Sequence, residues 1–199
     1  MKVITTETGK EKIVAIALTG DGRTELKVLE AIAQRYNGKE RAMLFPKSPL
    51  GGTSKGTSII KTAELVAKIT GITTVLIMID REHVQDIEGP LRETLKDAEI
   101  GPGNPIIARS KNMTILVVIL GKKKAIEENL AELINLEAGK QVVDPKLPVK
   151  ELKSQIKYIL KTEFGKPKSI KKFLERCKME NIERAFDGLA RALKLLEDF

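Results

Sequence analysis

The 199-residue sequence is poor in the side chains that form disulfides or hold soft metal ions. It has one cysteine, Cys177, one histidine, His83, and no tryptophan. These two residues cannot form a disulfide framework or a Cys/His zinc site. A catalytic metal ion would therefore need oxygen ligands, which favours Mg²⁺ or Mn²⁺.

Long apolar runs are also missing. No stretch of about 18 uninterrupted apolar residues is present, which argues against a membrane-spanning helix. The first residues lack the apolar block of a signal peptide. We therefore expect a cytoplasmic protein with no membrane partner.

Charge is abundant and unbalanced. The chain has 35 Lys and Arg against 27 Asp and Glu, for a net charge of +8. An excess of this size is compatible with a polyanionic partner such as nucleic acid. The same abundance of Lys and Glu, with little Cys and no Trp, is also typical of the surfaces of thermophile proteins. Charge alone leaves both interpretations open.

The first part of the chain alternates between apolar runs and helical patterns. The runs are rich in β-branched and aliphatic residues, as expected of parallel strands that are covered on both faces. Strands are predicted at 13–18, 41–45, 74–79 and 113–120, and helices at 24–36, 57–70 and 90–98. The alternation predicts an α/β protein with a central, mostly parallel sheet of about four strands flanked by helices.

From Lys122 onward the pattern becomes helical. Apolar stripes among charged residues predict helices at 122–137, 149–162, 168–178 and 181–197. We therefore divide the chain into an α/β domain at 1–121 and a helical C-terminal extension at 122–199 that packs on it.

Two acidic clusters each follow a predicted buried strand. Asp21 and Glu25 follow 13–18, and Asp80 and Glu82 follow 74–79. Ligands of open α/β sheets bind beyond the carboxyl ends of the strands, so these carboxylates are candidates for a shared Mg²⁺ site and for catalysis. In the structural alternative, the first pair stabilises a helix N-terminus and the second lies in a solvated turn.

These two clusters carry a resemblance to a known family. Residues 20–25, Gly-Asp-Gly-Arg-Thr-Glu, resemble the Glu-Gly-x-Thr-Glu signature of Toprim domains, the topoisomerase/primase fold that is shared with OLD-family nucleases. Residues 80–82, Asp-Arg-Glu, resemble the Asp-x-Asp motif of that family. Position 21 is Asp where the family has Glu, and position 82 is Glu where it has Asp. The resemblance covers about residues 12–120 and implies a Toprim-like Rossmannoid fold.

The resemblance also implies roles for the four acids. Asp80 and Glu82 would bind Mg²⁺ or Mn²⁺, Asp21 would bind metal or handle a proton, and Glu25 would help to hold a second ion. The implied activity is hydrolysis of phosphodiester bonds in nucleic acid.

Three basic residues are candidates for binding substrate phosphate. Lys55 lies in a Gly-rich loop at 51–58 that could cradle a phosphate or serve only as a connection. Arg81 and Lys111 lie near predicted strand ends, where they could line a phosphate path or be ordinary surface charges.

Two other functional interpretations remain open. The protein could be a non-catalytic module that binds nucleic acid or a partner protein, or a receiver-like or phosphatase-like protein in which an aspartate accepts a phosphoryl group beside Mg²⁺. The sequence is compatible with a homodimer and with a partner ATPase, and decides neither.

Overall fold

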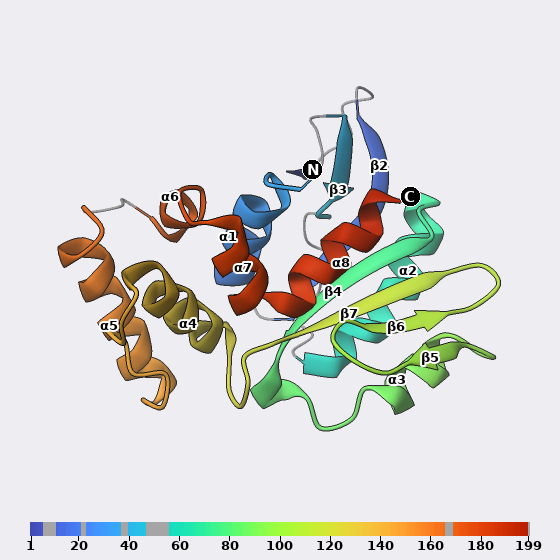
Figure 1. The fold of residues 1–199 in the computed structure, drawn as a ribbon. Coiled ribbons are helices and arrows are strands. Elements are labelled where there is room, and N and C mark those ends of the chain that lie inside the picture. Colours follow the sequence, from blue (N-terminus) through green and yellow to red (C-terminus); the bar gives the residue numbers. More distant parts are fainter. Residues whose placement is uncertain (6–10, 21–22, 37–39, 47–55, 166–168, 199) are drawn as a thin grey trace.

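The computed structural model describes residues 1–5, 11–20, 23–36, 40–46, 56–165 and 169–198. Within these ranges, helices cover a central sheet (Figure 1). None of the helices described there is long and apolar enough to cross a lipid bilayer.

The sheet has seven strands in the order β1-β3-β2-β4-β7-β6-β5. The first five in this order are parallel, whereas β6 is antiparallel to β7 and β5 is antiparallel to β6. The bounds are β1 (Lys2–Ile4), β2 (Lys12–Thr19), β3 (Arg41–Leu44), β4 (Thr74–Asp80), β5 (Glu99–Gly101), β6 (Ile106–Arg109) and β7 (Thr114–Leu120). β4 lies between β2 and β7, and all seven of its residues are buried.

The helices cover both faces of the sheet. Their bounds are α1 (Arg23–Ala33), α2 (Ile59–Thr70), α3 (Glu88–Thr94), α4 (Ile126–Ala138), α5 (Val149–Thr162), α6 (Ile170–Leu174), α7 (Met179–Ala185) and α8 (Asp187–Glu197), with short 3-10 turns η1 (Gly56–Ser58) and η2 (Arg81–His83). Leu76 and Met78 of β4 belong to one core with residues of α1 and α4 to α8. Val75, Ile77 and Ile79 belong to a second core with α2 and α3. This alternation follows from the two-residue period of a strand.

The α/β class and the flanking helices are as the sequence predicts. The sheet is larger than expected and it is mixed, because the sequence pattern does not predict β1, β5 or β6. Each has only three or four residues, too few to show a clear period. The predicted helix at 90–98 is also shorter, since α3 ends at Thr94 and β5 begins at Glu99.

The C-terminal helices share a core with the sheet. In Figure 1, α8 lies across one face of the sheet, while α4 and α5 lie to one side. Phe186 and Leu193 belong to the same core as Leu116 of β7 and Leu29 of α1. The hydrophobic core is therefore continuous across residue 121.

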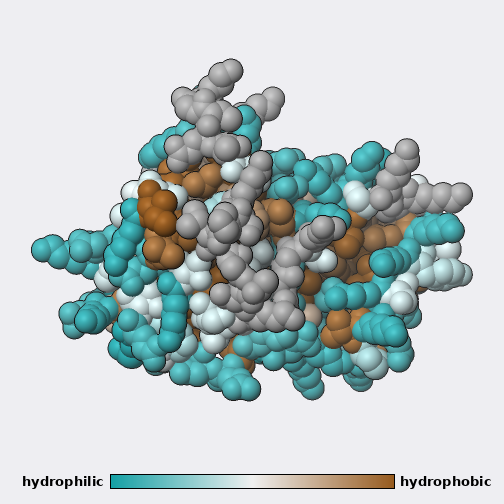
Figure 2. Space-filling view, turned by 180° about the vertical axis from the view of Figure 1, so that it is seen from behind, coloured by the Kyte–Doolittle hydropathy of each residue, from teal (hydrophilic) through white to brown (hydrophobic). Residues whose placement is uncertain are grey.

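The outer surface of α2 carries two exposed large apolar side chains, Leu65 and Ile69. Seen from behind, the molecule has a largely hydrophilic surface interrupted by hydrophobic areas (Figure 2). Scattered apolar side chains are normal on the surface of a monomer. They therefore identify no interface.

Candidate functional site

Asp80 is the last residue of β4 and points toward the face that α4 covers. Only 7% of it is exposed. Its Oδ1 accepts a hydrogen bond from the backbone N–H of Ile126, the first residue of α4, at 2.9 Å. A carboxylate at this place receives a free N–H from a helix N-terminus and lies at its positive end. The carboxyl edge of the sheet and the first turn of α4 thus meet at Asp80.

Two further buried carboxylates lie around Asp80. Glu25, in the first turn of α1, is 5% exposed, and Glu127, in the first turn of α4, is 4% exposed. Burial raises the pKa of Asp80, and the charges of Glu25, Glu127 and Glu82 raise it further, to about 7, although the Ile126 hydrogen bond acts against them. Burial is the largest cause of the shift, and the neighbouring carboxylates add electrostatic repulsion to it. Such an arrangement is typical of functional sites.

Lys153 compensates part of this charge. Nζ of Lys153, from α5, lies 3.3 Å from Oε1 of Glu127. The Lys153 side chain is 53% exposed, so solvent screens the pair. Lys153 therefore offsets only part of the charge of Glu127, which together with Glu25 and Asp80 forms what we call the acidic cluster.

The loop between β7 and α4 is held by a fourth acid. Oε2 of Glu128 accepts three backbone N–H groups, from Lys122, Lys123 and Lys124, at 2.7 to 2.9 Å. Burial alone would raise the pKa of Glu128, but these hydrogen bonds bring it below its ordinary value. Glu128 therefore shapes the loop that presents Ile126 to Asp80.

The chain does not stay extended after β4. Residues 81–83 form η2 instead, and the backbone N–H of Glu82 donates to the carbonyl of Lys124 at 2.7 Å. Asp80 and Glu82 therefore do not project from one extended strand. The Glu82 side chain is 41% exposed and lies 3.9 Å from Nε2 of His83. The negative charge of Glu82 also raises the pKa of Asp80, but it contributes the least of the causes that do so.

The described end of the Gly-rich segment, Gly56–Ser58, lies near this carboxyl edge. Lys55 lies outside the described residues, but Gly56, which follows it, has a left-handed φ of +63° and lies against His83. A Cβ on Gly56 would lie 3.0 Å from the carbonyl oxygen of His83. Gly56, Glu82 and His83 line a pocket of about 280 Å³.

The remaining predicted site residues are not all brought together. Asp21 lies outside the described residues. Arg81 is exposed in η2, directly after Asp80. Lys111 lies in the turn between β6 and β7, at the amino end of β7, whereas Asp80 pairs with Leu120 at its carboxyl end. The two ends of β7 are about 20 Å apart. Lys111 is therefore separated from the acidic cluster.

Sequence reasoning missed Glu127. The apolar stripe of the segment 122–137 predicts only an amphipathic helix among charges. A signal was present, because Glu127 lies in the first turn of a helix that follows a buried strand, as Glu25 does. The expectation that acids following a buried strand are site candidates, applied also to the residues after the strand at 113–120, would have identified Glu127.

The donor set suits a hard cation, but it is incomplete. Carboxylate oxygens are the ligands that Mg²⁺ and Mn²⁺ prefer. In the part of the chain that the structure describes, however, no three His, Cys, Asp or Glu side chains are placed to hold one ion together. Glu25, Asp80 and Glu127 could each supply an oxygen, and a full set of ligands would need Asp21, water or substrate.

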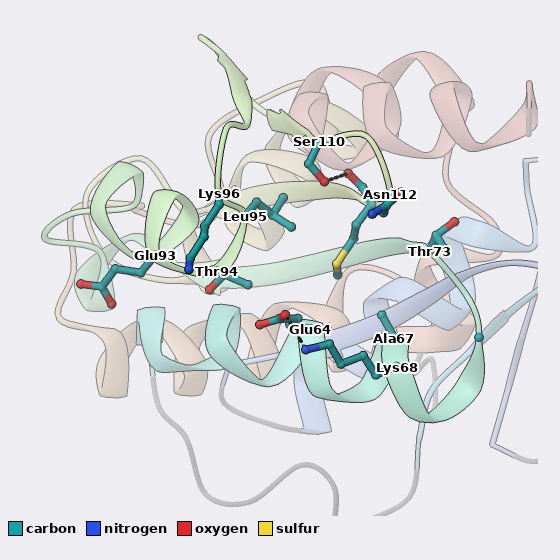
Figure 3. A pocket seen from close by; sticks show the side chains of 12 residues that line it. Glu64, Ala67, Lys68, Thr73, Glu93, Thr94, Leu95, Lys96, Ser110 and Asn112 are labelled. Atoms are coloured by element: carbon teal, nitrogen blue, oxygen red, sulfur yellow. Dashed lines mark hydrogen bonds and ion pairs between the residues drawn. The ribbon is translucent and has the colours of Figure 1, made fainter.

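A separate pocket lies at the opposite edge of the sheet. It has a volume of about 540 Å³ and is lined by residues that include Thr73, just before β4, and Met113, just before β7. Figure 3 shows Glu64 and Lys68 of α2 paired along one side of it, with Thr94 and Lys96 across from them. This is the amino edge of the parallel strands, so the pocket does not adjoin the acidic cluster.

Comparison with protein-family models, with curated proteins and with solved structures found no match for this chain.

Proposed function

We propose that this protein is a Toprim-like nuclease that hydrolyses phosphodiester bonds of nucleic acid with Mg²⁺ or Mn²⁺. The observation that carries the proposal is that Asp80 and Glu25 are both buried at the carboxyl edge of the sheet, where burial, followed by the charge of Glu25, raises the pKa of Asp80, which reaches about 7. A divalent cation would relieve the repulsion between such carboxylates. The proposal includes the Toprim assignment of residues 1–121 and a cytoplasmic location.

In this proposal each residue has a role that follows from its place at the carboxyl edge of the sheet. Asp80 and Glu25 would hold the cation from two sides, one from a strand end and one from a helix N-terminus, with Asp21, water or substrate completing the ligands, and the negative charge of nearby Glu127 would add to the attraction. A bound Mg²⁺ or Mn²⁺ would supply Lewis-acid activation of water and of the scissile phosphate. The Ile126 N–H fixes one oxygen of Asp80, which leaves the other for the cation. Arg81 would attract the substrate phosphate.

The non-catalytic binding module is the second candidate. It is favoured by one observation, that no three potential ligands of the described residues are placed to hold a metal ion together. It predicts nucleic-acid binding without metal-dependent cleavage.

The deciding experiment is cleavage of labelled single- and double-stranded DNA and RNA with Mn²⁺ or Mg²⁺, comparing wild type with Asp80→Asn. The substitution keeps the shape of the side chain and removes a charge that neighbouring carboxylates repel, so the variant should remain folded. Metal-dependent cleavage by the wild type that Asp80→Asn abolishes supports the proposal. A folded wild type that binds these substrates and cuts none of them favours the binding module.

A further inference from the structure

A third pocket lies near the acidic cluster, on the same face of the sheet. It has a volume of about 430 Å³ and is lined by the end of β7, including Leu120, and by the junction of α7 and α8. Leu120 is the direct ladder neighbour of Asp80, and neighbouring strands are about 4.8 Å apart. The pocket therefore begins one strand away from Asp80.

Three cations from three different segments line this pocket: Arg81 of η2, Lys122 of the β7–α4 loop and Arg184 of α7. All three side chains reach solvent. Among the described residues, Lys122 pairs with Glu132 at 3.0 Å, whereas Arg81 and Arg184 form no ion pair. The other acid lining the pocket, Asp187, pairs with Arg191. The two guanidinium groups are therefore available to an anionic ligand.

Hydrogen bonds connect the end of α7, which carries Arg184, to α4 and to the loop after β7. The carboxamide of Asn129 accepts from the backbone N–H of Gly121 at 2.6 Å and donates to the carbonyl of Ala185 at 2.7 Å. One side chain of α4 thus fixes both the loop after β7 and the residue next to Arg184. The Asn104 carboxamide, which lies against Gly188 of α8, pairs with both backbone groups of Ile119, at 2.8 and 3.0 Å.

We propose that this pocket binds the phosphates of a nucleic-acid strand that leads to Asp80, with Arg184 as a binding residue supplied by the C-terminal helices. The inference rests on the proposed function and adds its substrate path. Arginine suits this role because its planar group presents donors that match phosphate oxygens. A nucleic-acid strand whose phosphates contact Arg184, Lys122 and then Arg81 would extend from this pocket to the acidic cluster.

The test is binding of a fluorescent single-stranded oligonucleotide, followed by anisotropy in EDTA over a series of salt concentrations. Arg184→Gln should weaken binding about three- to tenfold and lower the salt slope by about one. Arg184→Lys should keep the salt slope, because the charge is retained. The matched control is Arg176→Gln, an exposed arginine of the same helical part that does not line the pocket, and it should stay within about twofold of wild type. Equal binding by wild type and Arg184→Gln, or equal losses in Arg184→Gln and Arg176→Gln, would overturn the inference.

Cleavage kinetics separate this inference from the proposed function. Arg184→Gln should raise KM and leave kcat within about twofold, because the residue binds substrate away from the reacting bond. If the wild type cleaves and Arg184→Gln has the same KM, the inference fails and the nuclease stands. If the wild type binds through Arg184 but never cleaves, the inference stands and the nuclease fails.

Discussion

The carboxylate of Asp80 accepts the backbone N–H of Ile126 at 2.9 Å. This contact joins the end of the central strand β4 to the first turn of α4, across 46 residues of sequence. It also brings Glu127, the next residue of α4, toward the carboxylates of Asp80 and Glu25. The acidic cluster is thus built by the junction of the sheet with the C-terminal helices.

The first prediction concerns the pH dependence of stability in the metal-free protein. The pKa of Asp80 is raised from 3.8 to about 7 by burial and by Glu25. Between these two values the folded state binds more protons than the unfolded state, so this residue makes stability fall as pH rises. Asp80→Asn removes the charge and should stabilise the protein by about 1 to 3 kcal/mol near pH 8 and by little near pH 4. Chemical denaturation in EDTA at both pH values measures this.

The control for Asp80 is Glu82→Gln, an exposed acid from the turn that follows the same strand. Its stability should stay within about 0.5 kcal/mol of wild type at both pH values. A destabilised Asp80→Asn near pH 8 would mean that the carboxylate is compensated in the metal-free protein.

The second prediction concerns Glu128, whose pKa is shifted in the opposite direction. Glu128→Gln replaces an acceptor of three backbone N–H groups with an amide that is uncharged and carries donors of its own. We expect a loss of about 1 to 3 kcal/mol at neutral pH. Because the pKa of Glu128 is lowered on folding, its contribution is present above its ordinary pKa and is lost as pH falls through the folded value. Exposed Glu151, in the first turn of α5, provides the control as Glu151→Gln, and equal losses in the two variants would contradict the role of Glu128.

The third prediction concerns the loop between β7 and α4. Gly121 has a φ of +77°, and a Cβ there would lie 2.6 Å from the carbonyl oxygen of Ala125. Gly139, at the end of α4, has a φ of +65° and open space around it. Both Ala substitutions are strained, but only Gly121→Ala also clashes with backbone. It should cost at least about 2 kcal/mol more than Gly139→Ala in thermal or chemical unfolding, and similar costs would show that the loop yields easily.

The fourth prediction tests the acid that sequence reasoning missed. Glu127→Gln should lower metal-dependent cleavage about tenfold or more, because it removes one of three buried carboxylates. Glu180→Gln changes an exposed acid in the first turn of α7 and should leave the rate unchanged. A fully active Glu127→Gln would limit the site to the acids of the first 121 residues.

The parts of the fold that sequence predicts best are those with a strong period or a clear end. Strand β4, predicted at 74–79, spans Thr74–Asp80, and helix α5, predicted at 149–162, has those bounds. Helix α2 ends where Gly71 takes a left-handed φ of +72°. Strands β5 and β6 were not predicted because each is too short to show an alternation of apolar and polar residues. They form only by pairing with each other and with β7 in the folded protein. Lys111 lies just before the strand predicted at 113–120, so in a parallel sheet the sequence pattern already places it at the amino edge, away from the acids at the carboxyl edge.

Part of the acidic cluster is visible in the sequence. A carboxylate after each buried strand is visible in sequence, and the structure brings Asp80 and Glu25 together. Sequence spacing could not reveal that residues 81–83 form a turn, because that turn depends on the backbone hydrogen bond between Glu82 and Lys124. Nor could it reveal the cation Arg184, which reaches the pocket because α7 packs on α4 and α8 packs on β7.

The most direct test of the acidic cluster as a metal site is calorimetric titration of Mn²⁺ into the metal-free wild type, Asp80→Asn and Glu25→Gln, with Glu151→Gln as the control. We predict saturable binding to the wild type and the control, and affinities lower by more than about tenfold in the two site variants. Equal Mn²⁺ binding by all four proteins, or none by the folded wild type, would contradict the claim that the acidic cluster is a divalent-cation site.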